Sequence, residues 1–277
     1  ITRSPSRRVC QASRAAGSLE NAWFLKEALV AREIEKELEL AASIQADLFP
    51  KVMPVEPGWE VAARNRQARQ VGGDYFDGMR LTQGGARRIL YLVADVAGKG
   101  MGSAILMSNI QATLRALLEH EPTLEAVARE ANKLLHANTP ANRYATAFLL
   151  LLDPETGAAD FVNCGHNNPL LLRADGKVEL LDSPGLALGM MPYATQEQAH
   201  AEFRPGDLVA IYTDGVSEAL NLQDEEFGLD RLAGVMKRLR EESAETILEG
   251  IFQAIEYHGG DAPQHDDITL MVRKRKP

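Results

Sequence analysis

The hydrophobic pattern changes character along the chain, and its first regular stretch is helical. Between Glu20 and Leu48 there is no Gly or Pro, and Ala, Leu, Glu and Lys dominate, all of which favour helix. Apolar residues recur there at intervals of three or four positions, as on one helix face: Ile34, Leu38, Ala41, Ile44 and Leu48. At 1.5 Å per residue the helix would be about 43 Å long. We predict that its apolar stripe pairs with a second copy in a parallel homodimer, and packing on its own domain is the alternative.

The segments on either side of this helix set the expected domain boundaries. Residues 1–19 are rich in Ser, Arg and Ala without periodicity, which predicts a disordered or truncated linker. The chain begins with Ile and has no apolar signal core, so we expect a piece or a processed product of a longer protein. Pro50 disfavours helix in the residue before it. We therefore expect a linker or dimerisation helix over 20–50 and one folded domain over 51–277.

From Pro57 onward, short apolar runs of strand character alternate with pairs of helical segments. The pattern predicts helices over 100–120, 123–137, 229–241 and 244–257. It predicts a hairpin of strands 75–81 and 88–94 across Gly84-Gly85, and further strands over 59–63, 144–152, 158–163, 170–173, 178–181, 197–203, 208–213 and 268–273. Strands grouped between helix pairs indicate an α+β fold rather than a doubly wound sheet.

Composition narrows the class of protein. The chain has 277 residues, 45% of them hydrophobic and 25% charged, which is ordinary for a globular protein. A formal net charge of −9 argues against nucleic acid as the main partner. The two cysteines form no disulfide framework and favour a reducing, cytoplasmic location. No apolar run approaches the roughly 18 residues that a membrane span requires.

The most informative feature is the position of acidic residues at the ends of apolar strands. Asp74 begins one predicted strand, and Asp95 and Asp214 directly follow two others. Asp266 and Asp267 directly precede the last strand. Such residues stand on rigid backbone at the rim of a core and can converge there. Clustered carboxylates raise one another's pKa unless a cation neutralises them, and oxygen-only ligation suits Mg²⁺, Mn²⁺ or Ca²⁺ rather than zinc or copper.

Other interpretations of these motifs are weaker. Taken singly, Gly-Gly-Asp74 and Asp214-Gly215 are typical of ordinary turns. The segment Ala97-Gly-Lys-Gly-Met-Gly102 is compatible with a nucleotide-binding loop, but it is not G-x-G-x-x-G. It also lacks an acidic residue at the end of a second strand. His166 lies in a turn between strands, where fixing its own loop is favoured over binding a ligand.

In chain order, five segments resemble the signatures of bacterial PP2C-type (PPM) serine/threonine phosphatases of the RsbU/SpoIIE-like branch. They are Val71–Asp77, Ala94–Gly102, Asn163–Pro169, Thr213–Glu218 and Asp266–Thr269. The segment from Glu37 to Pro50 also resembles the helix that enters that domain. The resemblance implies a PP2C-like α-β-β-α sandwich of two antiparallel sheets flanked by helix pairs.

The resemblance also implies roles for individual residues. Asp95 resembles the ligand that bridges two metal ions, with the Val96 carbonyl beside it. Asp214 resembles a further ligand, and Asp266 resembles the final one, although Asp267 could take that place. Asp74 resembles the acidic residue of the first motif, acting directly or through water, and Asp77 is a weaker candidate. No arginine matches the position that grips phosphate in larger relatives.

The function implied is Mn²⁺- or Mg²⁺-dependent hydrolysis of phosphoserine or phosphothreonine on a protein, with two ions bound. The substrate usual in the family is a STAS-domain anti-sigma-factor antagonist, and an upstream sensor domain or activator would control the enzyme. A regulatory pseudophosphatase that binds partners without turnover is the alternative, and the complete set of acidic residues argues against it.

Overall fold

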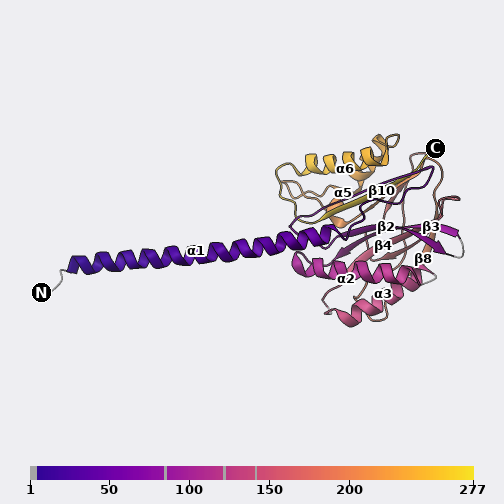
Figure 1. The fold of residues 1–277 in the computed structure, drawn as a ribbon. Coiled ribbons are helices and arrows are strands. Elements are labelled where there is room, and N and C mark those ends of the chain that lie inside the picture. Colours follow the sequence, from indigo (N-terminus) through magenta and orange to yellow (C-terminus); the bar gives the residue numbers. More distant parts are fainter. Residues whose placement is uncertain (1–4, 84–85, 121–122, 141) are drawn as a thin grey trace. The chain divides into compact units, whose positions relative to one another are not determined.

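The structure is a computed structural model, which describes residues 5–83, 86–120, 123–140 and 142–277 (Figure 1). The chain divides into two units, Ile1–Ile44 and Gln45–Pro277. The second, compact unit therefore begins six residues before the predicted boundary at residue 51, since the end of the first helix already packs with the domain.

Helix α1 spans Pro5–Ala46. It begins well before the predicted start at Glu20, so residues 5–19, which we expect to belong to a disordered or truncated linker, are helical. That segment carries several Ala and Arg residues, and their helix propensity needs no apolar stripe. Residues 1–4 lie outside the described part. From Trp23 to Ile44 most large apolar side chains of α1 are exposed in the single chain, including Leu25, Leu29, Ile34 and Ile44, whereas Leu38 is half-buried.

Two antiparallel five-stranded sheets form the centre of the compact unit. The first has the strand order β1-β10-β9-β6-β7, and the second has the order β2-β3-β4-β5-β8. The strands are β1 (Trp59–Arg66), β2 (Tyr75–Gln83), β3 (Ala86–Val96), β4 (Ala145–Leu152), β5 (Ala158–Cys164), β6 (Leu170–Leu172), β7 (Val178–Leu180), β8 (Gln198–Glu202), β9 (Leu208–Tyr212) and β10 (Ile268–Arg275). The helices are α2 (Met101–Leu118), α3 (Leu124–Asn138), α4 (Asp214–Ser217), α5 (Gly228–Arg238) and α6 (Ala244–Gly259).

The sheets are buried on both faces, which gives four layers. In β3, Leu90 and Leu92 belong to the core shared with α2 and α3, whereas Tyr91 and Val93 belong to the core between the sheets. Successive side chains of a strand point to opposite faces, so one apolar run supplies both cores. A third core joins β9 and β10 to α5 and α6. Figure 1 shows the two helix pairs on the outer faces of the two sheets. The predicted α-β-β-α sandwich is confirmed.

Most predicted elements match those observed to within a few residues. Helix α3 begins as predicted, because the Thr123 side chain accepts a hydrogen bond from the backbone N–H of Ala126. The predicted hairpin exists between β2 and β3, and its Gly84-Gly85 turn lies outside the described residues. The one-turn helix α4 was not predicted. Within the described ranges, no helix combines the length and the apolar character needed to cross a bilayer.

Candidate metal centre and active site

One edge of the sandwich carries the acidic residues singled out in the sequence. Asp95 lies at the end of β3, Asp214 opens α4 directly after β9, and Asp266 lies in the loop before β10. Together with Val96 and Lys99 they line a hollow of about 250 Å³, which we call the acidic hollow. Strand ends that are distant in the sequence thus meet at one edge of the sandwich, although β3 belongs to one sheet and β9 and β10 belong to the other.

Asp74 lies beneath this hollow rather than in its wall. It precedes Tyr75, which pairs with Ala94, so it stands next to Asp95 across the β2–β3 ladder. Its side chain is only 2% exposed. Its Oδ2 accepts hydrogen bonds from the hydroxyls of Thr213 (2.8 Å) and Thr269 (2.6 Å). These two threonines fix Asp74 to the strands that carry Asp214 and Asp266.

Asp267 is held by backbone amides. Its Oδ1 accepts from the N–H of Ala68 (2.8 Å) and its Oδ2 from the N–H of Gly73 (2.9 Å). A Cβ on Gly72 would lie 2.0 Å from Asp267 Oδ2, so this approach requires glycine. Asp267 therefore closes the loop before β2, whereas its neighbour Asp266 lines the acidic hollow.

Lys99 supplies the cation of the acidic hollow. Its Nζ lies 2.9 Å from Asp266 Oδ2 and donates a hydrogen bond to the carbonyl of His265 at 2.7 Å. Gly98 and Gly100 flank it with φ angles of 105° and 80°, in the left-handed region that favours glycine. The glycine-rich segment thus carries a lysine to the carboxylates. The chain then enters α2 and α3, and β4 runs antiparallel to β3, so this segment is not part of the parallel βαβ unit of a dinucleotide site.

The carboxylates perturb one another strongly. Burial, together with the nearby Asp214 and Asp266, raises the pKa of Asp95 to about 7. Burial and the adjacent Asp95 raise the pKa of Asp74 well above its ordinary value. The pKa values of Asp214 and Asp267 are raised as well, chiefly by burial and also by Asp266. The hollow therefore holds more negative charge than its own lysine can balance.

These residues are suited to bind a hard divalent cation that retains several water ligands. The donors are carboxylate and carbonyl oxygens, which suit Mg²⁺ and Mn²⁺. Among the residues that the structure describes, no three carboxylate, imidazole or thiolate side chains are grouped so as to bind one ion together. An ion here would take one or two carboxylates and complete its shell with water, as Mg²⁺ commonly does.

The loop around His166 is fixed mainly by Asn163. The Asn163 side chain accepts from the N–H of His166 (2.7 Å) and donates to its carbonyl (2.9 Å). The His166 ring contacts the hydroxyl of Thr146, a residue at the hollow, at 2.8 Å. Burial lowers the pKa of His166 to about 4, so its ring is neutral near pH 7.

Sequence reasoning missed several supporting residues. The buried Gln45 accepts from the N–H of Gly72 and donates to its carbonyl, which links the end of α1 to the loop that carries Asp74. Thr213 and Thr269 lie inside the quoted motifs, and their threonine hydroxyls were a usable signal. Asp77 pairs with Arg115 through Oδ2 at 2.7 Å, as a structural ion pair away from the hollow.

Comparison with known proteins agrees with this arrangement. The family model described as Stage II sporulation protein E (SpoIIE) matches residues 85–276. Protein IcfG of Synechocystis sp. is 28% identical over 88% of this chain and 43% of its own length. Phosphoserine phosphatase RsbU of Bacillus subtilis is 26% identical over 89% of this chain and 72% of its own length. The chain thus spans less than half of IcfG.

Solved structures share the fold. The SiaA-PP2C domain of Pseudomonas aeruginosa superposes with a TM-score of 0.78 at 19% identity, covering 88% of this chain and 98% of that domain. The catalytic domain of the serine threonine protein phosphatase PstP, solved with 2 manganese ions, superposes with a TM-score of 0.60 at 18% identity over 79% of this chain and 99% of that domain. With its two antiparallel sheets, its acidic edge and a family match over most of its length, the chain belongs to the SpoIIE family and has the fold of bacterial PP2C phosphatases.

Proposed function

We propose that this protein is a metal-dependent phosphoprotein phosphatase that hydrolyses phosphoserine or phosphothreonine. The observation that carries the proposal is the acidic hollow, where Asp95, Asp214 and Asp266 meet around a single lysine. Such a surplus of partly buried negative charge requires cations, and a phosphoryl group requires cations for binding and transfer. The similarity to phosphoserine phosphatase RsbU supports the same activity.

In this proposal each residue has a role derived from its position. Mn²⁺ or Mg²⁺ would be held by the carboxylates of Asp95, Asp214 and Asp266 and by the Val96 carbonyl. Asp74 would contribute directly or through water, and Asp267 would fix the loop before β2. When bound, two such ions activate a water molecule and neutralise charge on the phosphoryl group. The threonines at positions 213 and 269 hold Asp74 in place, and the rigid strand ends keep the carboxylates preorganised.

We further infer a signalling context. Family resemblance points to a phosphorylated STAS-domain anti-sigma-factor antagonist as substrate, in the cytoplasm, with an upstream sensor or activator. The exposed apolar residues of α1 support pairing of two copies through residues 20–48. Through the hydrogen bonds between Gln45 and Gly72, a change in the position of this helix would reach the loop that carries Asp74.

Hydrolysis of p-nitrophenyl phosphate tests the activity without knowledge of the natural substrate. We expect turnover with Mn²⁺ that EDTA abolishes. A pseudophosphatase would bind Mn²⁺ without turnover, and a dinucleotide enzyme would show neither. Either of those results would overturn the proposal.

A further inference from the structure

A second hollow adjoins the acidic one and is not used by the proposed chemistry. It has a volume of about 330 Å³ and shares Lys99, Asp214 and Asp266 with the acidic hollow. We call it the side groove. A phosphoserine bound at the acidic hollow is part of a polypeptide chain, and the side groove is adjoining space for a neighbouring residue of that chain.

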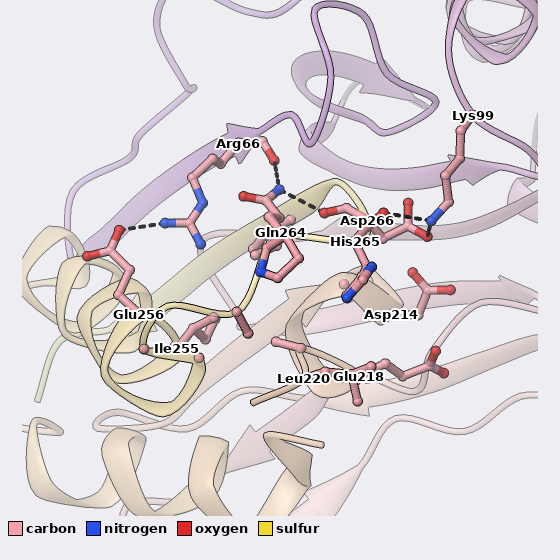
Figure 2. Close-up of a pocket in the computed structure, with 17 residues that line it drawn as sticks. Arg66, Lys99, Asp214, Glu218, Leu220, Ile255, Glu256, Gln264, His265 and Asp266 are labelled. Atoms are coloured by element: carbon pink, nitrogen blue, oxygen red, sulfur yellow. Dashed lines mark hydrogen bonds and ion pairs between the residues drawn. The ribbon is translucent and has the colours of Figure 1, made fainter. Parts of the chain in front are cut away.

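Among the described residues that line the side groove, two carboxylates have no ion-pair partner, those of Asp214 and Glu218. Lys99 is paired with Asp266 at 2.9 Å, and Arg66 with Glu256 at 2.5 Å. Figure 2 shows the Arg66–Glu256 pair at one end and the carboxylates of Asp214, Asp266 and Glu218 at the other. Asp214 is committed to the proposed metal centre. The Glu218 carboxylate is the remaining one, and no cation among the described residues pairs with it.

Glu218 also stands in an environment that favours a cation. It follows Asp214 by one turn and lies outside the acidic hollow, on the wall of the side groove. Its backbone N–H donates a hydrogen bond to the carbonyl of Asp214 at 2.7 Å, so Glu218 stands beside the acidic hollow. A positively charged group placed beside these carboxylates would relieve their mutual repulsion.

Part of the wall between the two ends is apolar, beside the polar side chains of Gln264 and His265. Leu220 and the buried residues Ile255 and Ile268 line it, and Figure 2 shows Leu220 and Ile255 between the two charged ends. Lysine and arginine have an aliphatic stem that packs on apolar surface and a charged end that seeks a carboxylate. A groove with a partly apolar wall and a free carboxylate matches that shape and charge.

We propose that the side groove receives a lysine or arginine side chain that lies close to the phosphoserine of the substrate protein, with Glu218 as the residue that selects it. The inference rests on the proposed phosphatase function. Because the two hollows share three residues and an extended chain advances about 3.3–3.6 Å per residue, the basic residue lies within about three positions of the phosphoserine.

Seven synthetic phosphopeptides test this proposal with the full-length protein. One has alanine at the three positions on each side of phosphoserine, and the other six each replace one alanine by lysine. For the wild type we expect at least one lysine peptide to be hydrolysed with a kcat/KM about fivefold or more above the alanine peptide. The gain should shrink in 0.5 M salt, because an exposed ion pair is screened.

Glu218→Gln removes the charge and keeps the shape. We expect the lysine gain to fall below about twofold while Mn²⁺-dependent turnover of p-nitrophenyl phosphate, which has no flanking chain, stays within about threefold of wild type. Glu155→Gln is the matched control: Glu155 is exposed in the turn that follows β4, whose opposite end lies at the acidic hollow, and this variant should retain the full gain.

Three results would overturn the inference. The first is a wild type with no lysine preference at any position, and the second is a preference that survives in Glu218→Gln. The third is a Glu218→Gln variant that loses p-nitrophenyl phosphate turnover along with peptide turnover, because Glu218 would then serve the metal centre. If the wild type hydrolyses nothing in the presence of Mn²⁺, the proposed function itself fails.

Discussion

Asp95 is the residue whose charge decides when the acidic hollow can accept a cation. Burial raises its pKa to about 7, with Asp214 and Asp266 contributing. Below pH 7 an incoming ion must displace the proton from Asp95, whereas above pH 7 this group is already ionised. We therefore expect Mn²⁺ affinity to weaken by up to about tenfold per pH unit as the pH falls below 7.

Calorimetry at pH 6 and pH 8 measures this directly, and two buffers of different ionisation enthalpy report the proton released. Equal affinities at the two pH values, with no proton released at pH 6, would show that Asp95 is already ionised at pH 6 without a metal ion and would contradict this prediction.

Lys99 competes for the same carboxylates as a metal ion. Its ammonium is paired with Asp266 and lies near enough to Asp214 to offset part of the rise in the pKa of that group. Lys99→Met removes this internal cation and keeps a flexible side chain of similar length. We expect Mn²⁺ to bind about tenfold more tightly in this variant, which corresponds to about 1.4 kcal/mol.

Lys133→Met is the control for this substitution, because Lys133 forms a surface ion pair with Glu130 on α3. It should leave the dissociation constant for Mn²⁺ unchanged. Unchanged or weaker Mn²⁺ binding by Lys99→Met would mean that the lysine supports the metal centre instead of competing with it.

Among the helices and strands, α1 is the element that we propose to pair two copies of the chain and to regulate the site. Ile34 and Ile44 are more than half exposed in the single chain. Burying these side chains against a second helix would gain free energy, because apolar surface would be removed from water. We expect Ile34→Glu to weaken a dimer by tenfold or more, since it places a charge in the seam between two helices. Sedimentation velocity over a range of protein concentrations measures the monomer–dimer equilibrium.

Lys36→Glu changes a neighbouring exposed position outside the stripe and should leave the dimer intact. A wild-type chain that is monomeric at every concentration would contradict the predicted dimer. The catalytic domain would be unaffected by that result, because its core does not depend on residues before Gln45.

Elements with strong local signals were predicted well, and those that depend on tertiary contacts were not. Buried on both faces, β3 and β4 read as continuous apolar runs bounded by turn residues, so their limits were visible in the sequence. The helical segment before Glu20 has no apolar stripe, which left helix propensity as its only signal. Helix α4 is a single turn, too short for any periodicity to reveal.

The candidate site was predictable for a similar reason. Asp95, Asp214 and Asp266 follow or precede apolar strands, so their positions at the sheet edge could be inferred from the chain alone. The different environments of Asp266 and Asp267 could not be inferred from the chain alone. Asp267 is held by the backbone amides of Ala68 and Gly73, which lie far from it in the sequence. The contact of Gln45 with Gly72 is likewise set by tertiary packing.

At the scale of the whole molecule, the acidic edge connects metal binding to stability. Four carboxylates with raised pKa values destabilise the metal-free fold near neutral pH, and a cation removes that repulsion. At 100 times its dissociation constant a ligand adds about 2.7 kcal/mol. For a domain of this size we expect the Tm to rise by about 5–10 °C in Mn²⁺ and to return in EDTA. A Tm that responds to neither would contradict a metal centre at this edge.

Metal-dependent phosphatase activity at the acidic hollow is tested most directly by phosphate release from a phosphoserine protein or peptide. The release is measured as a function of Mn²⁺ concentration, in the wild type and in Asp95→Asn. The substitution removes one charge from the acidic hollow and keeps the shape of the side chain. We expect saturable, EDTA-sensitive release by the wild type and a loss of at least about a hundredfold in Asp95→Asn, with the metal-free fold of the variant intact by circular dichroism. Release by Asp95→Asn at a rate close to that of the wild type would contradict this prediction.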